Sequence, residues 1–142
     1  MQYTLQNLAI ADYDEVLALW QRTEGVGLNE SDTREGIALF LERNRDLSFV
    51  ARDAKGRIIG AVLCGHDGRR GYLHHLAVEK ACRGQGIGRA LVENCLARLR
   101  ALGILKCNIF LYANNDPGRA FWERLGWAQR VDLCVLQKPL KP

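Results

Sequence analysis

The sequence predicts an α+β fold, in which a mixed, mostly antiparallel central sheet is flanked by about four helices. Two observations carry this prediction. Three short apolar stretches between residues 47 and 78 are separated only by tight turns, which is typical of an antiparallel meander. Two helical stretches precede them, and two more follow. No linker divides the chain, so we assign residues 1–142 to a single domain.

The first third predicts one strand and two helices. Residues 2–8 alternate weakly between apolar and polar types, which favours a strand. A helix should begin at Asp12, a residue suited to the cap, because apolar residues recur at helical spacing over 16–20. Two glycines then interrupt the pattern. Residues 31–44 predict a second helix, with Asp32 as its cap and a glutamate three residues later.

The middle of the chain predicts the meander, with strands over 47–53, 58–65 and 72–78. Side chains alternate between the two faces of a strand. On the third strand this alternation separates two neighbouring histidines. His74 should share a face with Tyr72 and Leu76, and His75 should share the opposite face with Leu73 and Ala77.

The last third predicts a long helix after the glycine-rich turn 83–89, with apolar positions from 91 to 99. A strand over 106–113 should follow. Asn115 or Asp116 should then cap a short helix over 118–125. The segment 127–136 predicts one or two final strands.

The charge is unevenly distributed. The first 71 residues carry nine basic and eleven acidic side chains, whereas the last 71 carry eleven and five. The C-terminal half should therefore attract an anion. Its basic residues are dispersed and lie in no recognition motif, so we expect a small anionic ligand and no nucleic acid.

The five cysteines show no C-x-x-C pair, and their number is odd. A disulfide framework and a metal site are therefore both disfavoured, and we expect buried free thiols. A reactive Cys82 is the exception left open. The N-terminus lacks the features of a signal peptide, and the apolar runs are too short to span a bilayer. We expect a cytoplasmic protein without a membrane partner.

The glycine-rich turn predicts a phosphate site. Backbone N–H groups at the start of a helix bind anions, and glycines let the backbone approach a phosphate closely. The turn lacks the Lys-Ser or Lys-Thr of a P-loop, and an arginine stands where the dinucleotide-binding motif needs its third glycine. It satisfies a third pattern, [RQ]-x-x-G-x-[GA], with Arg83-Gly84-Gln85-Gly86-Ile87-Gly88, and Arg89 follows.

These residues resemble the GNAT (GCN5-related) N-acetyltransferase superfamily, and in particular its RimI- and YpeA-like single-domain members. In that family the amides of this motif hold the pyrophosphate of acetyl-CoA. Leu76-Ala77-Val78 occupies the place of the strand that pairs with the pantetheine arm. Residues 115–127 are similar to the family segment N-x-x-A-x-x-x-Y-x-x-x-G-F, so Asn115 should bond the pantetheine or a neighbouring backbone group. The resemblance extends over about residues 3–136 and implies a GNAT fold with no metal.

Two departures from the family concern catalysis. Trp122 stands where the family often has a tyrosine that protonates the leaving thiolate, and an indole is not an acid near neutral pH. Tyr112, water, or no acid at all could replace it, and we expect Trp122 to pack against the cofactor arm or the core. Phe110 stands where RimI-like enzymes carry a glutamate base. Arylalkylamine acetyltransferases carry a histidine at the position of His74, which makes His74 our candidate base.

The resemblance implies an acetyl-CoA-dependent N-acetyltransferase. We expect the acetyl group to pass from acetyl-CoA to a primary amine by direct attack in a ternary complex, with a backbone N–H near Leu76 stabilising the oxyanion. The acceptor, a small molecule or a peptide, should lie over residues 24–32, of which three are acidic. The alternative is an acyl-CoA-binding sensor without turnover, motivated by the missing tyrosine and glutamate. A homodimer stays open.

Overall fold

The central feature of the fold is a five-stranded mixed sheet in the order β1-β2-β3-β4-β5. The structure is a computed structural model, and it describes residues 1–141. Neighbouring strands run antiparallel except β4 and β5, which are parallel. The prediction of a mixed, mostly antiparallel sheet is confirmed. The strands are β1 (Tyr3–Asn7), β2 (Phe49–Asp53), β3 (Ile58–His66), β4 (Gly71–Val78) and β5 (Cys107–Ile109).

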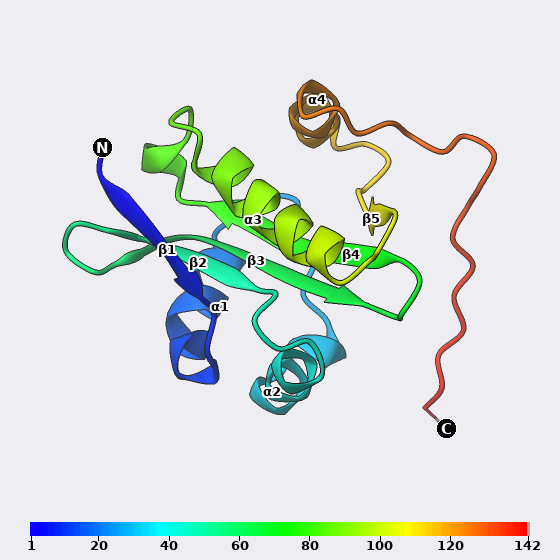
Figure 1. Cartoon of the computed structure of the whole chain (residues 1–142), viewed down its shortest axis with the longest axis horizontal. Coiled ribbons are helices and arrows are strands. Elements are labelled where there is room, and N and C mark those ends of the chain that lie inside the picture. Colours follow the sequence, from blue (N-terminus) through cyan, green and yellow to red (C-terminus); the bar gives the residue numbers. More distant parts are fainter. Residues whose placement is uncertain (142) are drawn as a thin grey trace.

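Helices cover both faces of this sheet (Figure 1), so the molecule has three layers. Helix α3 packs on one face, and helices α1 and α2 pack on the other. Strand β3 lies in the middle and is buried along almost its whole length, which explains its nearly continuous apolar sequence. The α-helices are α1 (Tyr13–Gln21), α2 (Arg34–Arg43), α3 (Ile87–Ala101) and α4 (Asp116–Arg124), and short 3-10 turns lie at η1 (Ile10–Asp12), η2 (Glu30–Asp32) and η3 (Lys80–Cys82).

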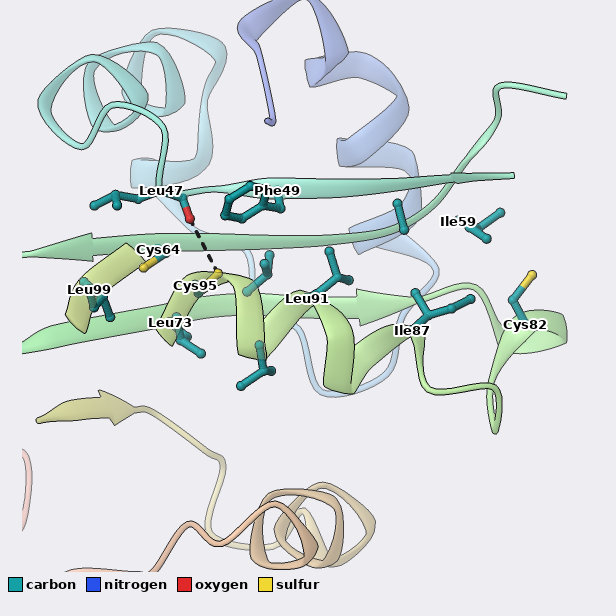
Figure 2. Close-up of a cluster of buried hydrophobic side chains, with 13 residues drawn as sticks. Leu47, Phe49, Ile59, Cys64, Leu73, Cys82, Ile87, Leu91, Cys95 and Leu99 are labelled. Carbon is teal, nitrogen blue, oxygen red and sulfur yellow. Dashed lines mark hydrogen bonds between the residues drawn. The ribbon is translucent and has the colours of Figure 1, made fainter. Parts of the chain in front are cut away.

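The core consists of two clusters separated by the sheet. Figure 2 shows the cluster beneath α3, to which the helix contributes residues spaced three or four apart, the spacing that forms one apolar face. The cluster on the opposite face takes its largest fully buried side chains, Leu19 and Trp20, from α1, and both are 1% exposed. Burial on both faces makes the sheet a rigid base for the edge where β4 meets β5.

The predicted cap position is correct for α1 and wrong for α2. Asp12 stands at the N-cap of α1, but its carboxylate accepts a hydrogen bond from the Ala9 N–H and pairs with Arg52, and it makes no capping bond to α1. Helix α2 is capped by Thr33, whose hydroxyl accepts from the Gly36 N–H at 3.1 Å. Asp32 instead closes η2, where its carboxylate accepts from the Asn29 N–H at 3.0 Å. The carboxylates of Asp12 and Asp32 still accept from free backbone N–H groups, but these groups lie about one turn before the helix starts that we predicted them to cap.

The C-terminal part departs most from the prediction. Strand β5 ends at Ile109, where the prediction extended to 113. The predicted strands within 127–136 do not form, and Figure 1 shows this segment as an extended tail beside the sheet. From Ala128 onward its side chains are exposed, including that of Cys134, which corrects the expectation of a buried thiol there. Cys82 is buried.

The pairing of β3 with β4 contains a bulge that overturns the predicted faces of β4. Ala61 faces Ala77 and Leu63 faces His74, which leaves Val62 opposite two residues, His75 and Leu76. His75 takes a left-handed backbone conformation with φ of 53°. The alternation therefore changes phase at His75. Its ring lies on the α1 side with that of His74, and Leu76 packs into the α3-side cluster.

Candidate active site

A large cavity lies where β4 and β5 diverge. The two strands pair only as far as Leu73 and Ile109, and beyond that point neither bonds the other. The cavity has a volume of about 1380 Å³ and extends from the start of α3 to the loop between α1 and α2. Its walls come from both faces of the sheet, so ligands on the two sides of β4 could meet within it.

The start of α3 lines this cavity and has the features that suit an anion. Gly86 precedes the helix in a left-handed conformation with φ of 81°, and no side chain caps the helix. The first N–H groups of a helix have no carbonyl partner within it, so those of Ile87, Gly88 and Arg89 are available to an anion. A Cβ added at Gly84 or Gly86 would meet nothing within 4 Å, which shows that space for a ligand exists beside this backbone.

Basic side chains surround this helix start. Arg83 donates from Nε to the carbonyl of Val78 at 3.0 Å, which ties the turn to the end of β4. Arg83, Arg89 and Arg124 all line the cavity. Charged donors of this kind strengthen phosphate binding. The sequence pattern identified the first two, and Arg124 was missed because it lies on α4, 35 residues beyond the motif.

The edge of β4 provides the next wall. Leu76, Ala77 and Val78 line the cavity along the strand that lacks a neighbour beyond Leu73. Trp122 lines it from α4 and packs edge-on against Trp127, with ring centroids 4.9 Å apart. Of the residues predicted to hold the cofactor, only Gln85 lies outside the cavity lining. Those within it are Leu76, Ala77, Val78, Arg83, Gly84, Gly86, Ile87, Gly88, Arg89, Asn115 and Trp122.

The loop between α1 and α2 meets the segment after β5. A Cβ built on Gly27 would lie 1.9 Å from the Tyr112 hydroxyl, and one built on Gly25 would lie 2.8 Å from the Asn115 amide nitrogen. Gly25 and Gly27 therefore allow the loop to approach Asn115 and Tyr112 more closely than a residue with a side chain could. Asn115 caps α4, since its Oδ1 accepts from the Gly118 N–H at 3.0 Å. The contact places the Tyr112 hydroxyl at the edge of the cavity.

His74 lies among aromatic rings at the other end of the cavity. Its ring stacks with those of Tyr72 and Phe110 at centroid distances of 6.2 Å, and Phe40 of α2 approaches edge-on at 6.0 Å. Burial lowers the pKa of His74 below its usual range, and the neighbouring His75 lowers it further. A neutral imidazole can accept a proton, so this environment keeps His74 in the form that a base requires.

His75 lies in a hydrogen-bonded network that sequence reasoning missed. Its Nε2 lies 2.9 Å from Oδ1 of Asp32, and its carbonyl accepts from the Trp20 indole N–H at 3.0 Å. The left-handed backbone of a non-glycine residue costs on the order of 1–3 kcal/mol, and these contacts offset that cost. No local pattern in the sequence points to these contacts, because the partners Asp32 and Trp20 are 43 and 55 positions away from His75.

Two remaining features bear on the expected chemistry. Within residues 1–141, no three His, Cys, Asp or Glu side chains gather as a metal site would require. In the same part of the chain, no helix combines the length and the apolar character needed to cross a membrane. His66, which precedes the turn after β3, accepts a hydrogen bond from the Gly68 N–H and takes no part in the cavity lining.

Comparison with known proteins identifies the family. The model of the acetyltransferase (GNAT) family matches residues 13–127. The chain belongs to the GNAT acetyltransferase family. A curated relative, the acetyltransferase SG1711 of Sodalis glossinidius, is 32% identical to this GNAT over 129 residues, which are 91% of this chain and 89% of the relative.

Solved structures share the fold of this GNAT. The Ard1 structure from Thermoplasma volcanium has a TM-score of 0.78 at 20% identity, covering 90% of this chain and 84% of the other. The PaiA N-acetyltransferase of Thermoplasma acidophilum, solved in complex with coenzyme A, has a TM-score of 0.77 at 18% identity, covering 88% and 89%. The expected fold is confirmed. The family also confirms the prediction of an acetyl-CoA-dependent acetyltransferase, and it favours an enzyme over a non-catalytic sensor.

Proposed function

We propose that this GNAT acetylates a primary amine by direct attack within a ternary complex, and that both substrates bind in the cavity between β4 and β5. The observation that carries the proposal is the shared cavity. The uncapped start of α3 opens at one end, and His74 lies at the other. Acetyl-CoA supplies the activated acetyl thioester. Proximity is then the main contribution of the protein, because it holds the amine in line with that thioester.

The residues of α3 and β4 orient the cofactor. The amides of Gly86, Ile87 and Gly88, with Arg83 and Arg89, would hold the pyrophosphate. The exposed edge of β4 from Leu76 to Val78 would bond the pantetheine arm, as a neighbouring strand would. The fit is supported by the open space beside Gly84 and Gly86, where a phosphate can approach the backbone.

The acceptor enters from the opposite side, over the loop between α1 and α2. Glu24 of this loop lines the cavity and would attract a cationic amine. His74 removes the ammonium proton, directly or through water, so that the nitrogen attacks as a free base. The backbone N–H of Leu76 stabilises the negative charge that develops on the thioester oxygen. Water, or the Tyr112 hydroxyl, returns a proton to the departing thiolate.

A panel of amines tests this proposal. The panel contains a peptide N-terminus, a lysine side chain, a polyamine, an aminoglycoside, an amino acid and an arylalkylamine, each offered with acetyl-CoA. Thiol release above the acceptor-free rate is expected for at least one class. Calorimetric binding of acetyl-CoA without thiol release from any amine would instead support the sensor.

A further inference from the structure

We propose that Trp20 is a positioning residue for catalysis, which acts through the peptide unit between His75 and Leu76. The inference rests on the proposed role of the Leu76 N–H in stabilising the oxyanion. Trp20 is 1% exposed and lies near the end of α1, on the opposite side of the sheet from α3. It packs in the cluster that includes Ala77 of β4, and it does not itself line the cavity.

The contact of Trp20 is with the backbone of the bulge. Its indole N–H donates to the His75 carbonyl at 3.0 Å. That carbonyl belongs to the same planar unit as the N–H of Leu76. In a trans peptide the two groups point in opposite directions, and no peptide bond within residues 1–141 is cis. By holding the carbonyl toward α1, Trp20 directs the Leu76 N–H away from α1, and Leu76 lines the cavity.

The bulge needs this anchor because regular pairing is absent there. Val62 of β3 faces both His75 and Leu76, so the ladder does not determine how the peptide between them is rotated. His75 also has φ of 53°, a conformation that few non-glycine residues adopt without support. Contacts from outside the sheet must therefore set the orientation of this peptide.

Helix α1 provides the anchors as a unit. Tyr13 and Trp20 are seven residues apart, which places them on the same face of the helix. The Tyr13 hydroxyl donates to the carbonyl of Asp32 at 2.6 Å, and Oδ1 of Asp32 lies 2.9 Å from Nε2 of His75. One face of α1 thus fixes the carbonyl of His75 directly and its side chain through Asp32. The loop that would carry the acceptor connects this helix to η2, so the acceptor wall and the bulge share one support.

The experiment compares Trp20→Phe with Ser48→Ala. Trp20→Phe keeps an aromatic ring in the core but removes the indole donor. Ser48→Ala removes a different buried hydrogen bond, in which the hydroxyl accepts from the Cys64 N–H at 2.9 Å, and Ser48 does not line the cavity. Both variants should melt at a lower temperature. Only Trp20→Phe should lower kcat, by about 10- to 100-fold, because a small displacement of a catalytic group has an effect of this size. Its KM for acetyl-CoA should not change.

The amide resonance of Leu76 provides a second measurement that needs no acceptor. In the wild-type protein this resonance should differ between the CoA and acetyl-CoA complexes, and Trp20→Phe should abolish the difference while Ser48→Ala preserves it. If Trp20→Phe does not fold, Asp32→Ala removes the side-chain anchor and should shift the same resonance with a smaller loss of kcat. Wild-type kcat and a wild-type Leu76 resonance would overturn the inference, as would a kcat loss no larger than that of Ser48→Ala. Failure of every amine in the panel would contradict the proposed function alone.

Discussion

Gly56 and Gly86 adopt the same backbone φ of 81°, although one turns the hairpin between β2 and β3 and the other precedes α3. A Cβ added at either residue would meet nothing within 4 Å. The two positions therefore impose the same backbone strain on any other residue, about 1–2 kcal/mol. They differ in surroundings, because only Gly86 lines the cavity. This pair separates an effect on cofactor binding from an effect on folding.

Gly86→Asp should abolish acetyl-CoA binding, because the new carboxylate would project where the pyrophosphate is proposed to lie. Calorimetry measures the affinity, and thermal melting measures the stability. Gly56→Asp should lower the melting temperature to a similar extent and leave the affinity unchanged. Equal affinities for Gly86→Asp and the wild-type protein would show that the cofactor does not use this turn.

Asn115→Ala should weaken acetyl-CoA binding by about 0.5–1.5 kcal/mol, the contribution of one hydrogen bond. It should also destabilise the protein by about 0.5–2 kcal/mol, because the cap of α4 is lost. Thr33→Ala is the matched control, since Thr33 caps α2 through the same kind of bond and lies outside the cavity lining. A loss of stability in both variants with no change in affinity would limit Asn115 to capping.

His74→Ala should lower turnover by about 10²- to 10⁴-fold, the usual contribution of a positioned base. In the wild-type enzyme the rate should rise with pH through an apparent pKa below the ordinary value for histidine, because burial lowers the pKa of His74. The variant should lack this rise. Rates with a saturating amine across the pH range measure the effect.

His66→Ala provides the control for this profile, because His66 lies at a turn outside the cavity. His75→Ala is not a suitable control for the pH profile, because the bulge brings His75 into the cavity lining and into contact with Asp32. If the His74→Ala enzyme kept the wild-type pH profile, a group other than His74 would be the base. The acetyltransferase assignment would not change.

His74→Phe should make stability less sensitive to acid. The unfolded chain protonates His74 near its ordinary pKa of about 6.5, whereas the folded protein does so at a lower pH. The unfolded state therefore binds more protons between these two values, and the stability present above pH 6.5 declines as the pH falls through this window. Phenylalanine preserves the aromatic contacts without titrating. Urea unfolding at pH 7.5 and pH 5 measures the free energy of unfolding, and the difference between the two values should be smaller for the variant than for the wild-type protein. An equal difference would contradict a lowered pKa for His74.

The sequence allowed good prediction wherever structure depends on neighbouring residues. The meander, the turn before α3 and the apolar face of α3 all follow from local spacing, and their boundaries agree within two residues for β2, β3 and β4. The start of α3 and its glycines, where we propose that the pyrophosphate binds, could be located in the same way, because they are adjacent in the chain. The residues proposed to bind pyrophosphate were therefore identifiable without coordinates.

Features that depend on distant partners could not be predicted. The phase change at His75 follows from the pairing of Val62 with two residues and from Trp20, which lies 55 positions away. Strict alternation along β4 therefore assigned His75 to the wrong face. The tail has a strand-like alternation at Val131, Leu133 and Val135, but a strand also needs a neighbour, and none pairs with it within residues 1–141.

The exposure of Cys134 affects how acetyl transfer can be followed. Colorimetric reagents that detect released CoA also react with accessible protein thiols, and Cys134 is the accessible cysteine of the tail. Cys64, Cys82 and Cys95 are shielded by the core, and burial raises the pKa of Cys107 to about 12, which keeps it in the unreactive thiol form. Replacing Cys134 with serine should therefore remove most of the background signal. The same isolated thiol, next to the cavity-lining Val135, would accept a single fluorophore that reports when the tail approaches a bound ligand.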